Sequence, residues 1–248
     1  TFDPNGKGTG GTSIVFSEGN TRVTHKFSSS GARISMPVSF ATSQGKFYVE
    51  LTLTANDGSG DGLPRTNAGI YDIIETPFPS DYIGSASTGL GGAGIYTQTG
   101  QLYNNGTAYD LSLGAFAVGD VVQYALDFDN GAMYIGKNGT FLNSGDPTSG
   151  ASKTNAVWKW IGNGKRKFVF ATSSASASIS TDTVNFGQKS FSHNIPTGYT
   201  KWQQDNISET NKGVTGFTWI KDRDNTLNHN SYDSSQGAFN RLVPNATS

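Results

Sequence analysis

The chain has no cysteine, and only 15% of its 248 residues are charged. Without cysteine it can form neither disulfide bonds nor metal sites with thiolate ligands. Small secreted domains of eukaryotes usually depend on such bridges to stabilise a small core. The composition therefore favours a protein made in a reducing cytoplasm, including that of a bacterial host.

Long apolar runs and a strong net charge are also missing. No stretch approaches the length of about 18 apolar residues that a membrane-spanning helix needs, and the opening "TFDPNGKGTGG" has no basic and apolar signal region. A net charge of −1 gives no field that would attract nucleic acid or an anionic membrane. We expect neither nucleic-acid binding nor membrane insertion. The chain starts at Thr1 rather than Met, which is consistent with an internal fragment or a processed product.

Glycine, small polar residues and aromatic residues are abundant instead. The chain has 32 Gly, and 12% of its residues are Phe, Tyr or Trp. Turn formers at this level, with few residues that favour helices, indicate an all-β protein. Its core would be built from rings and β-branched side chains.

About a dozen segments alternate apolar and polar residues, as half-buried strands do. In "KFYVELTL", Phe47, Val49, Leu51 and Leu53 share one face, whereas Glu50 lies on the opposite, polar face. No segment has the pattern of an amphipathic helix of three turns. The pattern predicts an antiparallel sandwich of two sheets. The expected strands lie within residues 12–18, 22–28, 32–40, 45–55, 67–73, 93–98, 100–110, 121–129, 131–137, 139–144, 167–173 and 181–188.

The composition changes after about residue 200, where a polar stretch follows. We therefore predict a main domain over residues 1–202 and an extension over residues 203–248. The only clear strand pattern in the extension is "GFTWIK". Two alternatives remain for this extension, a docking segment and the first strands of a second β-module.

Three Asn-Gly pairs mark expected hairpin turns. Asn130-Gly131, Asn138-Gly139 and Asn105-Gly106 each follow a strand-like segment. Two-residue hairpin turns need positive φ at both central residues, which Asn and Gly tolerate best. Residues 121–144 are therefore expected to form a three-stranded meander. In contrast, we predict a bend in the glycine-rich run Gly89 to Gly94.

The first of these turns also contains a fragment of a calcium-binding pattern. Asp127, Asp129 and Gly131 follow the spacing of a calcium loop, but Asn138 stands where an EF-hand requires glutamate. A strand that ends at a turn accounts for the same residues. The alternative is a calcium ion held by Asp129, Asn130 and nearby carbonyl groups. We expect no metal and no cofactor.

No arrangement of residues indicates catalysis. Glycoside hydrolysis would need two carboxyl groups held at a fixed separation across a cleft. Glu50 on a polar strand face and Asp120 in a loop are expected to be solvated or to cap turns. The three histidines have no metal-type spacing, and we expect no enzyme activity. The acidic candidates are Glu50, Asp72, Glu75, Asp110 and Asp120.

The segment "NAVWKWIGNGKRKFVF" contains the strongest candidates for binding. Trp158 and Trp160 fall on one face of an extended segment, Lys159 falls on the other, and a basic cluster follows. Exposed indoles would stack on sugar rings, while the cations would meet an acidic glycan or a neighbouring subunit. Buried indoles would instead be core rings beside a solvated turn. Tyr82, Tyr96, Tyr103 and Tyr109 raise the same question. The candidate binding residues are Trp158, Trp160, Lys165, Arg166, Lys167 and Tyr103.

Four motifs in this order resemble the SPRY (B30.2-like) domain family, in the versions found in structural proteins of tailed phages. They are "GKFYVELTL" (residues 45–53), "NAGIYD" (67–72), "VGDVVQYALDFDNGAMYIGKNGTFLNSGDP" (118–147) and "TVNFGQKSF" (183–191). They span most of the predicted main domain. The resemblance implies a bent, concanavalin-like sandwich of two antiparallel sheets that serves in recognition or assembly without catalysis.

The tail resembles a second phage module, which opens "GLVWIKNR" and continues with "H…YDS…RG". The match covers residues 216–248. Gln236 departs from the usual arginine of that pattern. The residues that match are Trp219, Ile220, Lys221, Arg223, His229, Tyr232, Asp233 and Ser234.

Together the two resemblances imply a non-enzymatic virion protein, such as a capsid decoration knob, tail fibre or tail appendage. It would be assembled in the bacterial host cytoplasm and displayed on the particle surface. Its partners would be other virion proteins and a host-surface glycan, and it would form a homo-oligomer, with a trimer typical of fibres and knobs. The alternatives are a lectin-like carbohydrate-binding module and, less favoured, a polysaccharide depolymerase.

Overall fold

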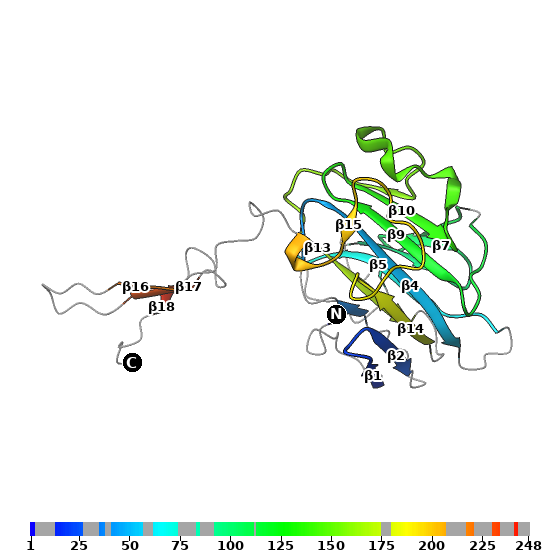
Figure 1. The fold of residues 1–248 in the computed structure, drawn as a ribbon, viewed down its shortest axis with the longest axis horizontal. Helices are drawn as coiled ribbons and strands as arrows, with labels where there is room; N and C mark the ends of the chain where they lie inside the picture. Colours follow the sequence, from blue (N-terminus) through cyan, green and yellow to red (C-terminus); the bar gives the residue numbers. More distant parts are fainter. Residues whose placement is uncertain are drawn as a thin grey trace, which may run out of the picture. The chain divides into compact units, whose positions relative to one another are not determined.

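In the computed structural model, the regular secondary structure of the described residues is almost entirely β-strand (Figure 1). The contacts divide it into two compact units, Thr1–Ile207 and Ser208–Ser248. Among the described residues, no helix combines the length and the hydropathy of a membrane crossing. The structure describes residues 1–2, 13–26, 35–37, 41–56, 62–73, 83–84, 92–111, 113–174, 180–206, 217–220, 230–233 and 241–242.

The first unit contains a nine-stranded and a six-stranded sheet. Neighbouring strands are antiparallel, except that β15 pairs with β4 in parallel. Figure 1 shows β14, β4, β9 and β10 as adjacent strands of the larger sheet. The larger sheet has the order β1 (Ser13–Ser17), β2 (Arg22–Lys26), β14 (Ser180–Asn185), β4 (Lys46–Asn56), β9 (Val121–Asp127), β10 (Ala132–Lys137) and β11 (Thr140–Phe141), with β12 (Trp158–Lys159) on β10 and β15 (Thr200–Lys201) on β4.

The smaller sheet begins with the short strand β3 and ends with the hairpin β7–β8. Short 3₁₀ turns, η2 (Leu142–Ser144), η3 (Pro147–Ser152) and η4 (Gln204–Asn206), lie outside both sheets. The predicted antiparallel two-sheet architecture is confirmed. The order of the smaller sheet is β3 (Ser35–Pro37), β13 (Phe168–Ser174), β5 (Thr66–Asp72), β6 (Gly92–Tyr96), β7 (Gln101–Asn104) and β8 (Thr107–Tyr109).

The second unit is a three-stranded antiparallel sheet of β16 (Phe217–Ile220), β17 (Asn230–Asp233) and β18 (Arg241–Leu242). The strand expected in "GFTWIK" is therefore present. The predicted boundary at residues 202 and 203, and the choice between a docking segment and a second module, stay predictions.

The main core lies between the two sheets and is rich in aromatic rings. The expected face of β4, with Phe47, Val49, Leu51 and Leu53, is fully buried in it. Phe128 lies among four rings of this core, at centroid distances of 5.5 to 6.2 Å. These rings belong to Phe47, Trp160, Phe168 and Trp202.

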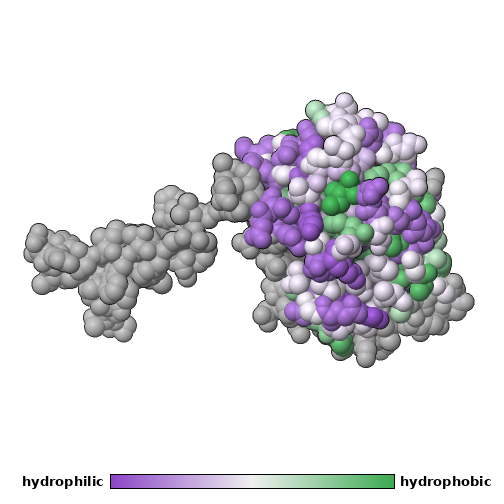
Figure 2. All heavy atoms as spheres, in the orientation of Figure 1, coloured by the Kyte–Doolittle hydropathy of each residue, from purple (hydrophilic) through white to green (hydrophobic). Residues whose placement is uncertain are grey.

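The outer face of the larger sheet is also covered. Tyr48 and Tyr134 pack there with Tyr199 and Phe191, from a segment that follows β14. Glu50 is therefore only 2% exposed, and its carboxylate accepts hydrogen bonds from the backbone N–H groups of Ser192 (2.7 Å) and His193 (2.8 Å). The expectation of a solvated Glu50 is wrong, because a distant segment covers this face. Figure 2 shows that the covered side presents mainly hydrophilic residues with small apolar patches.

Two of the three Asn-Gly turns have the expected geometry. The φ angles are 49° and 93° at Asn138-Gly139, and 49° and 75° at Asn105-Gly106. At Asn130-Gly131, however, only the glycine has positive φ (77°). β9 already ends at Asp127 and the loop has four residues, so the chain closes without a left-handed Asn130. The predicted meander β9–β10–β11 is confirmed.

The expected bend in the glycine-rich run is wrong for its described part, because Gly92 to Gly94 form the start of strand β6. The strands β5 and β6 approach closely there. A Cβ atom built on Gly69 would lie 2.0 Å from the backbone oxygen of Ala93. The glycines therefore permit close strand packing rather than a turn. Residues 89–91 lie outside the described part.

Candidate functional site

Strand β12 places the two predicted tryptophans at an edge of the larger sheet. Trp158 pairs with Met133 of β10, and the Trp160 N–H donates to the carbonyl of Gly131 (3.0 Å). Their side chains fall on the same face, as the alternation predicts, and their rings stack at a centroid distance of 4.9 Å. Lys159 lies between them and is exposed.

The two rings differ in burial, and the core interpretation from the sequence holds for Trp160, whereas the role of Trp158 in binding stays a prediction. Trp160 is 8% exposed and belongs to the main core, 5.2 Å from the ring of Phe168. Trp158 is half-buried and packs against that core. The buried ring of Trp160 therefore holds the ring of Trp158 in place by stacking on it. Trp158 is only half-buried, so it stays partly accessible to solvent.

Arg166 is held between an acid and aromatic rings. Its Nε atom lies 2.6 Å from Oδ2 of Asp72, a fully buried residue at the end of β5. The guanidinium lies 4.9 Å from the ring centroid of Phe168 and 5.9 Å from that of Trp158. Cation–π contact and the ion pair together fix its position beside the tryptophans.

A surface pocket of about 410 Å³ lies at this edge, between β12 and the β7–β8 hairpin. It brings together four of the six predicted residues: Trp158, Trp160, Lys165 and Arg166. Sequence reasoning missed the others: Asn104 and Asn105 come from the β7–β8 hairpin of the other sheet, Asn163 was interpreted only as a turn residue, and Lys159 was placed on the face opposite the tryptophans. The missed residues are Asn104, Asn105, Lys159, Ile161 and Asn163.

A second pocket of about 260 Å³ adjoins the first and shares Asn104, Trp158 and Lys159 with it. We name the two together the edge groove. This second part is mainly apolar. Its remaining lining residues are Leu102, Tyr109, Leu111, Ala156 and Val157.

Two predicted residues do not line the edge groove. Lys167 is exposed outside it, where its carbonyl accepts a hydrogen bond from Ile73 (2.9 Å). Tyr103 alternates with Leu102 and Asn104 on β7, so its side chain lies on the opposite face of the sheet. Its ring packs edge-on against Tyr96 at 6.2 Å. The strand alternation would have separated Tyr103 from the site, had the partner strands been known. Tyr82 lies outside the described residues.

The chemistry of the edge groove suits an anionic ligand with an apolar surface. Lys159, Lys165 and Arg166 line it, and none of its described lining residues is acidic. Ile161 is 75% and Tyr109 is 46% exposed, so each offers apolar area on the rim. The asparagine amides can both donate and accept hydrogen bonds.

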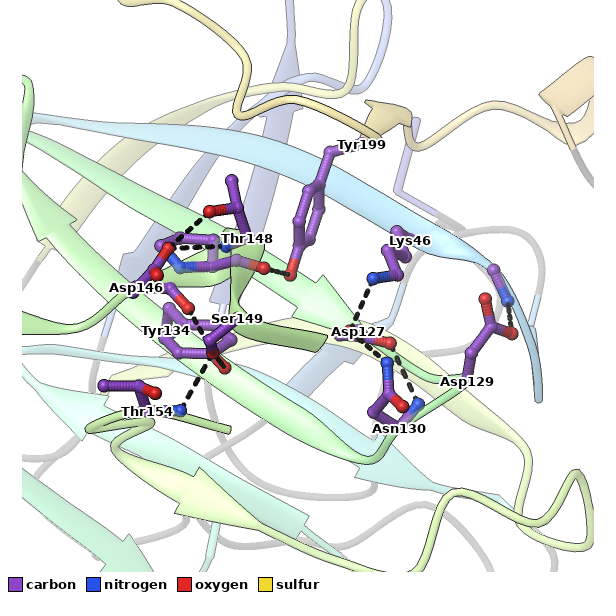
Figure 3. Close-up of polar contacts among 12 residues, drawn as sticks. Lys46, Asp127, Asp129, Asn130, Tyr134, Asp146, Thr148, Ser149, Thr154 and Tyr199 are labelled. Carbon is purple, nitrogen blue, oxygen red and sulfur yellow. Dashed lines mark hydrogen bonds and ion pairs between the residues drawn. The ribbon is translucent and has the colours of Figure 1, made fainter. Parts of the chain in front are cut away.

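The carboxylates of the calcium-like fragment contact groups of the chain itself (Figure 3). Asp127 is fully buried and pairs with Lys46 (3.0 Å), and it accepts from the N–H and the side-chain amide of Asn130 (2.9 and 2.8 Å). Asp129 accepts from the N–H of Gly45 (2.7 Å). These bonds fasten the β9–β10 loop to β4. Within the described residues, no three His, Cys, Asp or Glu side chains gather as a metal site would require.

The other acidic candidates are spread over the unit. Asp120 accepts from the Ala117 N–H (2.7 Å) and pairs with Lys137 (2.9 Å), so it caps a turn as expected. Asp110 is exposed beyond β8, and Glu75 lies outside the described residues. Asp72 is bound to Arg166.

A layer of buried polar residues lies between the sheets, far from solvent. Both oxygens of Asp182 accept from the Thr66 hydroxyl (2.8 and 2.7 Å), and Nε2 of His25 lies 3.4 Å from the Thr172 hydroxyl. Burial raises the pKa of Asp182 to about 7, although the Thr66 bond opposes this. Burial lowers the pKa of His25 to about 4. These hydrogen bonds link the two sheets. The side chains of Asp182 and His25 are buried, so no substrate can reach them in the folded chain.

Comparison with known proteins places this architecture. No protein-family model and no curated protein sequence matches the chain. The SPRY domain of human HERC1 is similar in structure, with a TM-score of 0.54 and 17% identity over 77% of this chain and 100% of that domain. Another human SPRY domain has a TM-score of 0.47 and 13% identity over 73% of this chain and 100% of its own length. The likeness to the HERC1 domain shows that the chain contains a β-sandwich with the fold of a SPRY domain.

Proposed function

We propose that the chain is a non-enzymatic recognition module that binds its ligand in the edge groove. The observation that carries the proposal is the groove itself, where a half-exposed indole, three amides and three cations meet without an acidic residue among the described lining. Three of the five acidic candidates, Glu50, Asp72 and Asp120, contact backbone N–H groups or cations at separate places. Binding without catalysis accounts for this arrangement.

The ligand class that fits is an acidic saccharide. The ring of Trp158 would stack on the apolar face of a sugar, and asparagine amides would bind its hydroxyl groups. Lys159 and Lys165 would attract the carboxylate. Arg166 already pairs with Asp72, so its main contribution is to keep the indoles in place.

Exchange of Trp158 for alanine is expected to weaken binding of an acidic oligosaccharide by roughly fivefold, because an aromatic stacking contact contributes about 1 kcal/mol. Lys165→Glu should weaken it as well, with a loss that diminishes at high salt. Isothermal titration of the purified chain against acidic and neutral oligosaccharides would measure both effects.

Lys167→Glu is the matched control. It makes the same charge change as Lys165→Glu and lies in the same basic cluster, but Lys167 does not line the edge groove. We expect a much smaller effect than that of Lys165→Glu. Equal losses for the two variants, or unchanged affinity in Trp158→Ala, would contradict the groove as the site. Binding of a protein ligand in place of every saccharide would keep the groove but overturn the ligand class.

We further propose that the module acts on the surface of a phage particle, as a decoration knob, tail fibre or tail appendage. The support is the resemblance of the four SPRY-like motifs and of the tail to phage structural proteins. A homo-oligomer, such as a trimer, would sum weak single-site contacts into strong attachment to a host glycan. Other virion proteins would attach this oligomer to the particle.

Mass spectrometry of purified particles tests this placement. The chain should co-purify with particles in a fixed ratio to the capsid protein, and antibody labelling should locate it on the surface. Its presence only in the lysate, with none on particles, would rule out a virion role and leave the groove proposal standing.

A further inference from the structure

The β-sandwich unit contains five Asn-Gly pairs, of which Asn5-Gly6 lies outside the described residues. The other four differ in how firmly hydrogen bonds hold them. Asparagine followed by glycine is the sequence most open to spontaneous deamidation, because glycine leaves the backbone nitrogen unhindered. The reaction requires a free asparagine side chain whose carbonyl carbon can approach the nitrogen of the next residue. Contacts that restrain either group slow it.

Three of the pairs are restrained. Oδ1 of Asn138 accepts from the Val121 N–H (2.8 Å), and its amide donates to Asp120 (2.7 Å). The N–H of Gly139 donates to Gln123 (2.6 Å). All groups that would react are therefore engaged in hydrogen bonds.

The pair Asn130-Gly131 is restrained in a similar way. The amide of Asn130 donates to the buried carboxylate of Asp127 (2.8 Å), and the Gly131 N–H donates to the carbonyl of Asp127 (2.8 Å). Asn130 is half-buried and Gly131 is buried. The loop would have to open before the two groups could react.

In the pair Asn163-Gly164, Oδ1 of Asn163 accepts a hydrogen bond from the Lys165 N–H (3.1 Å), so this side chain is restrained as well. The side chain of Asn105 is different. Asn105 is exposed at the tip of the β7–β8 hairpin, and its side chain makes no hydrogen bond within the described part of the chain. The N–H of Gly106 has one bond, to the carbonyl of Gly84 (2.8 Å). Asn105 also lines the edge groove with Lys159 and Lys165.

We propose that Asn105-Gly106 is a site of spontaneous deamidation and that the product adds a negative charge to the edge groove. The Gly106 nitrogen loses its proton to hydroxide and attacks Cγ of Asn105, which forms a C–N bond. The side-chain nitrogen takes a proton from water and leaves as ammonia. Water then opens the cyclic imide at either carbonyl, which gives aspartate or isoaspartate.

The modification changes what the edge groove binds, a consequence that depends on the proposed function. Asn105 contributes a neutral amide to a lining with three cations and no described acid. A carboxylate there repels an anionic ligand and offsets one of the cations. The groove of an aged molecule therefore has lower affinity for acidic ligands than that of a fresh one.

The test is incubation of the full chain in mildly alkaline buffer, followed by peptide mapping of aspartate and isoaspartate at Asn105, Asn130 and Asn138 over time. We expect deamidation at Asn105 at least roughly tenfold faster than at Asn130 or Asn138, because each restraining hydrogen bond must open first. Asn105→Gln should abolish the fastest phase. Equal rates at Asn105, Asn130 and Asn138, or a slower rate at Asn105, would overturn the proposal.

A second measurement separates this proposal from the proposed function. Asn105→Asp carries the product charge from the start, and its affinity for acidic and neutral oligosaccharides can be compared with that of the fresh chain. Reduced affinity for the acidic ligand alone supports the charge effect. Fast deamidation at Asn105 together with unchanged binding in Asn105→Asp would keep the chemistry and overturn its effect on the groove.

Discussion

At neutral pH, Asp182→Asn is expected to raise the free energy of unfolding by up to about 4 kcal/mol. Burial raises the pKa of Asp182 from its ordinary value of 3.8 to about 7. A pKa difference of about 3 corresponds to about 4 kcal/mol that the folded state loses when this carboxyl ionises. Asparagine can still accept from the Thr66 hydroxyl and never becomes charged.

The pH dependence gives a sharper test than stability at one pH. Between about pH 4 and pH 7, the folded state binds more protons at Asp182 than the unfolded state does, so the contribution of Asp182 to stability falls as pH rises. The contribution of His25 to stability changes with pH in the opposite direction. The pKa of His25 is lowered from 6.5 to about 4, so its contribution rises with pH over that interval.

The two contributions therefore largely cancel in the wild-type chain between about pH 4 and 6.5. Asp182→Asn should reveal a stability that increases with pH, and His25→Gln should reveal one that decreases. Urea denaturation followed by tryptophan fluorescence, at several pH values, measures each curve. If the pH slopes of Asp182→Asn and wild type coincide, the pKa of Asp182 is not raised by burial.

Thr66→Val is the companion variant. It keeps the shape of the side chain but removes the hydroxyl that donates to both oxygens of Asp182. The carboxylate then has no such donor, so its pKa should rise further and stability above pH 7 should decrease. In an Asp182→Asn background, Thr66→Val should lower the free energy of unfolding by a smaller amount, because no buried charge then loses its hydrogen-bond donor.

Phe128→Ala is expected to lower the free energy of unfolding by about 3 to 5 kcal/mol, the usual loss for a large aromatic ring removed from a core. Phe128 is 1% exposed, and its ring contacts those of four other aromatic residues. Trp160 and Phe168, which support Trp158 in the edge groove, are among them. Ligand affinity should therefore decrease together with stability.

Phe141→Ala serves as the control, because this half-buried ring lies at the periphery of the outer cluster rather than in the main core. Phe141→Ala should lower the free energy of unfolding by only about 1 kcal/mol, because the ring of Phe141 buries a smaller area. Phe128→Leu should fall between the two and remain measurable if Phe128→Ala does not fold. A smaller decrease in the free energy of unfolding for Phe128→Ala than for Phe141→Ala would show that the packing of the core rings does not require Phe128.

Local patterns in the sequence determined the strands and several of their turns. Alternation in "KFYVELTL" correctly put Phe47 and Val49 in the core, because successive side chains of a strand must point to opposite faces. Asn138-Gly139 was recognised because few other residues accept positive φ at two successive positions. The shared face of Trp158 and Trp160 followed from the same alternation, whereas the stacking of their rings was seen only in the structure.

Only the tertiary structure decided which faces are covered and which residues meet. Glu50 is buried by a segment more than 130 residues later in the chain, with Ser192 in it, and no local pattern contains that contact. The edge groove joins Asn104 of the smaller sheet to Trp158 of the larger sheet, and it also contains Asn105 from the β7–β8 turn and Lys165 from the segment between β12 and β13. Side-chain alternation specifies two faces for each strand, but the pairing of distant strands determines which face turns inward and which residues share a surface.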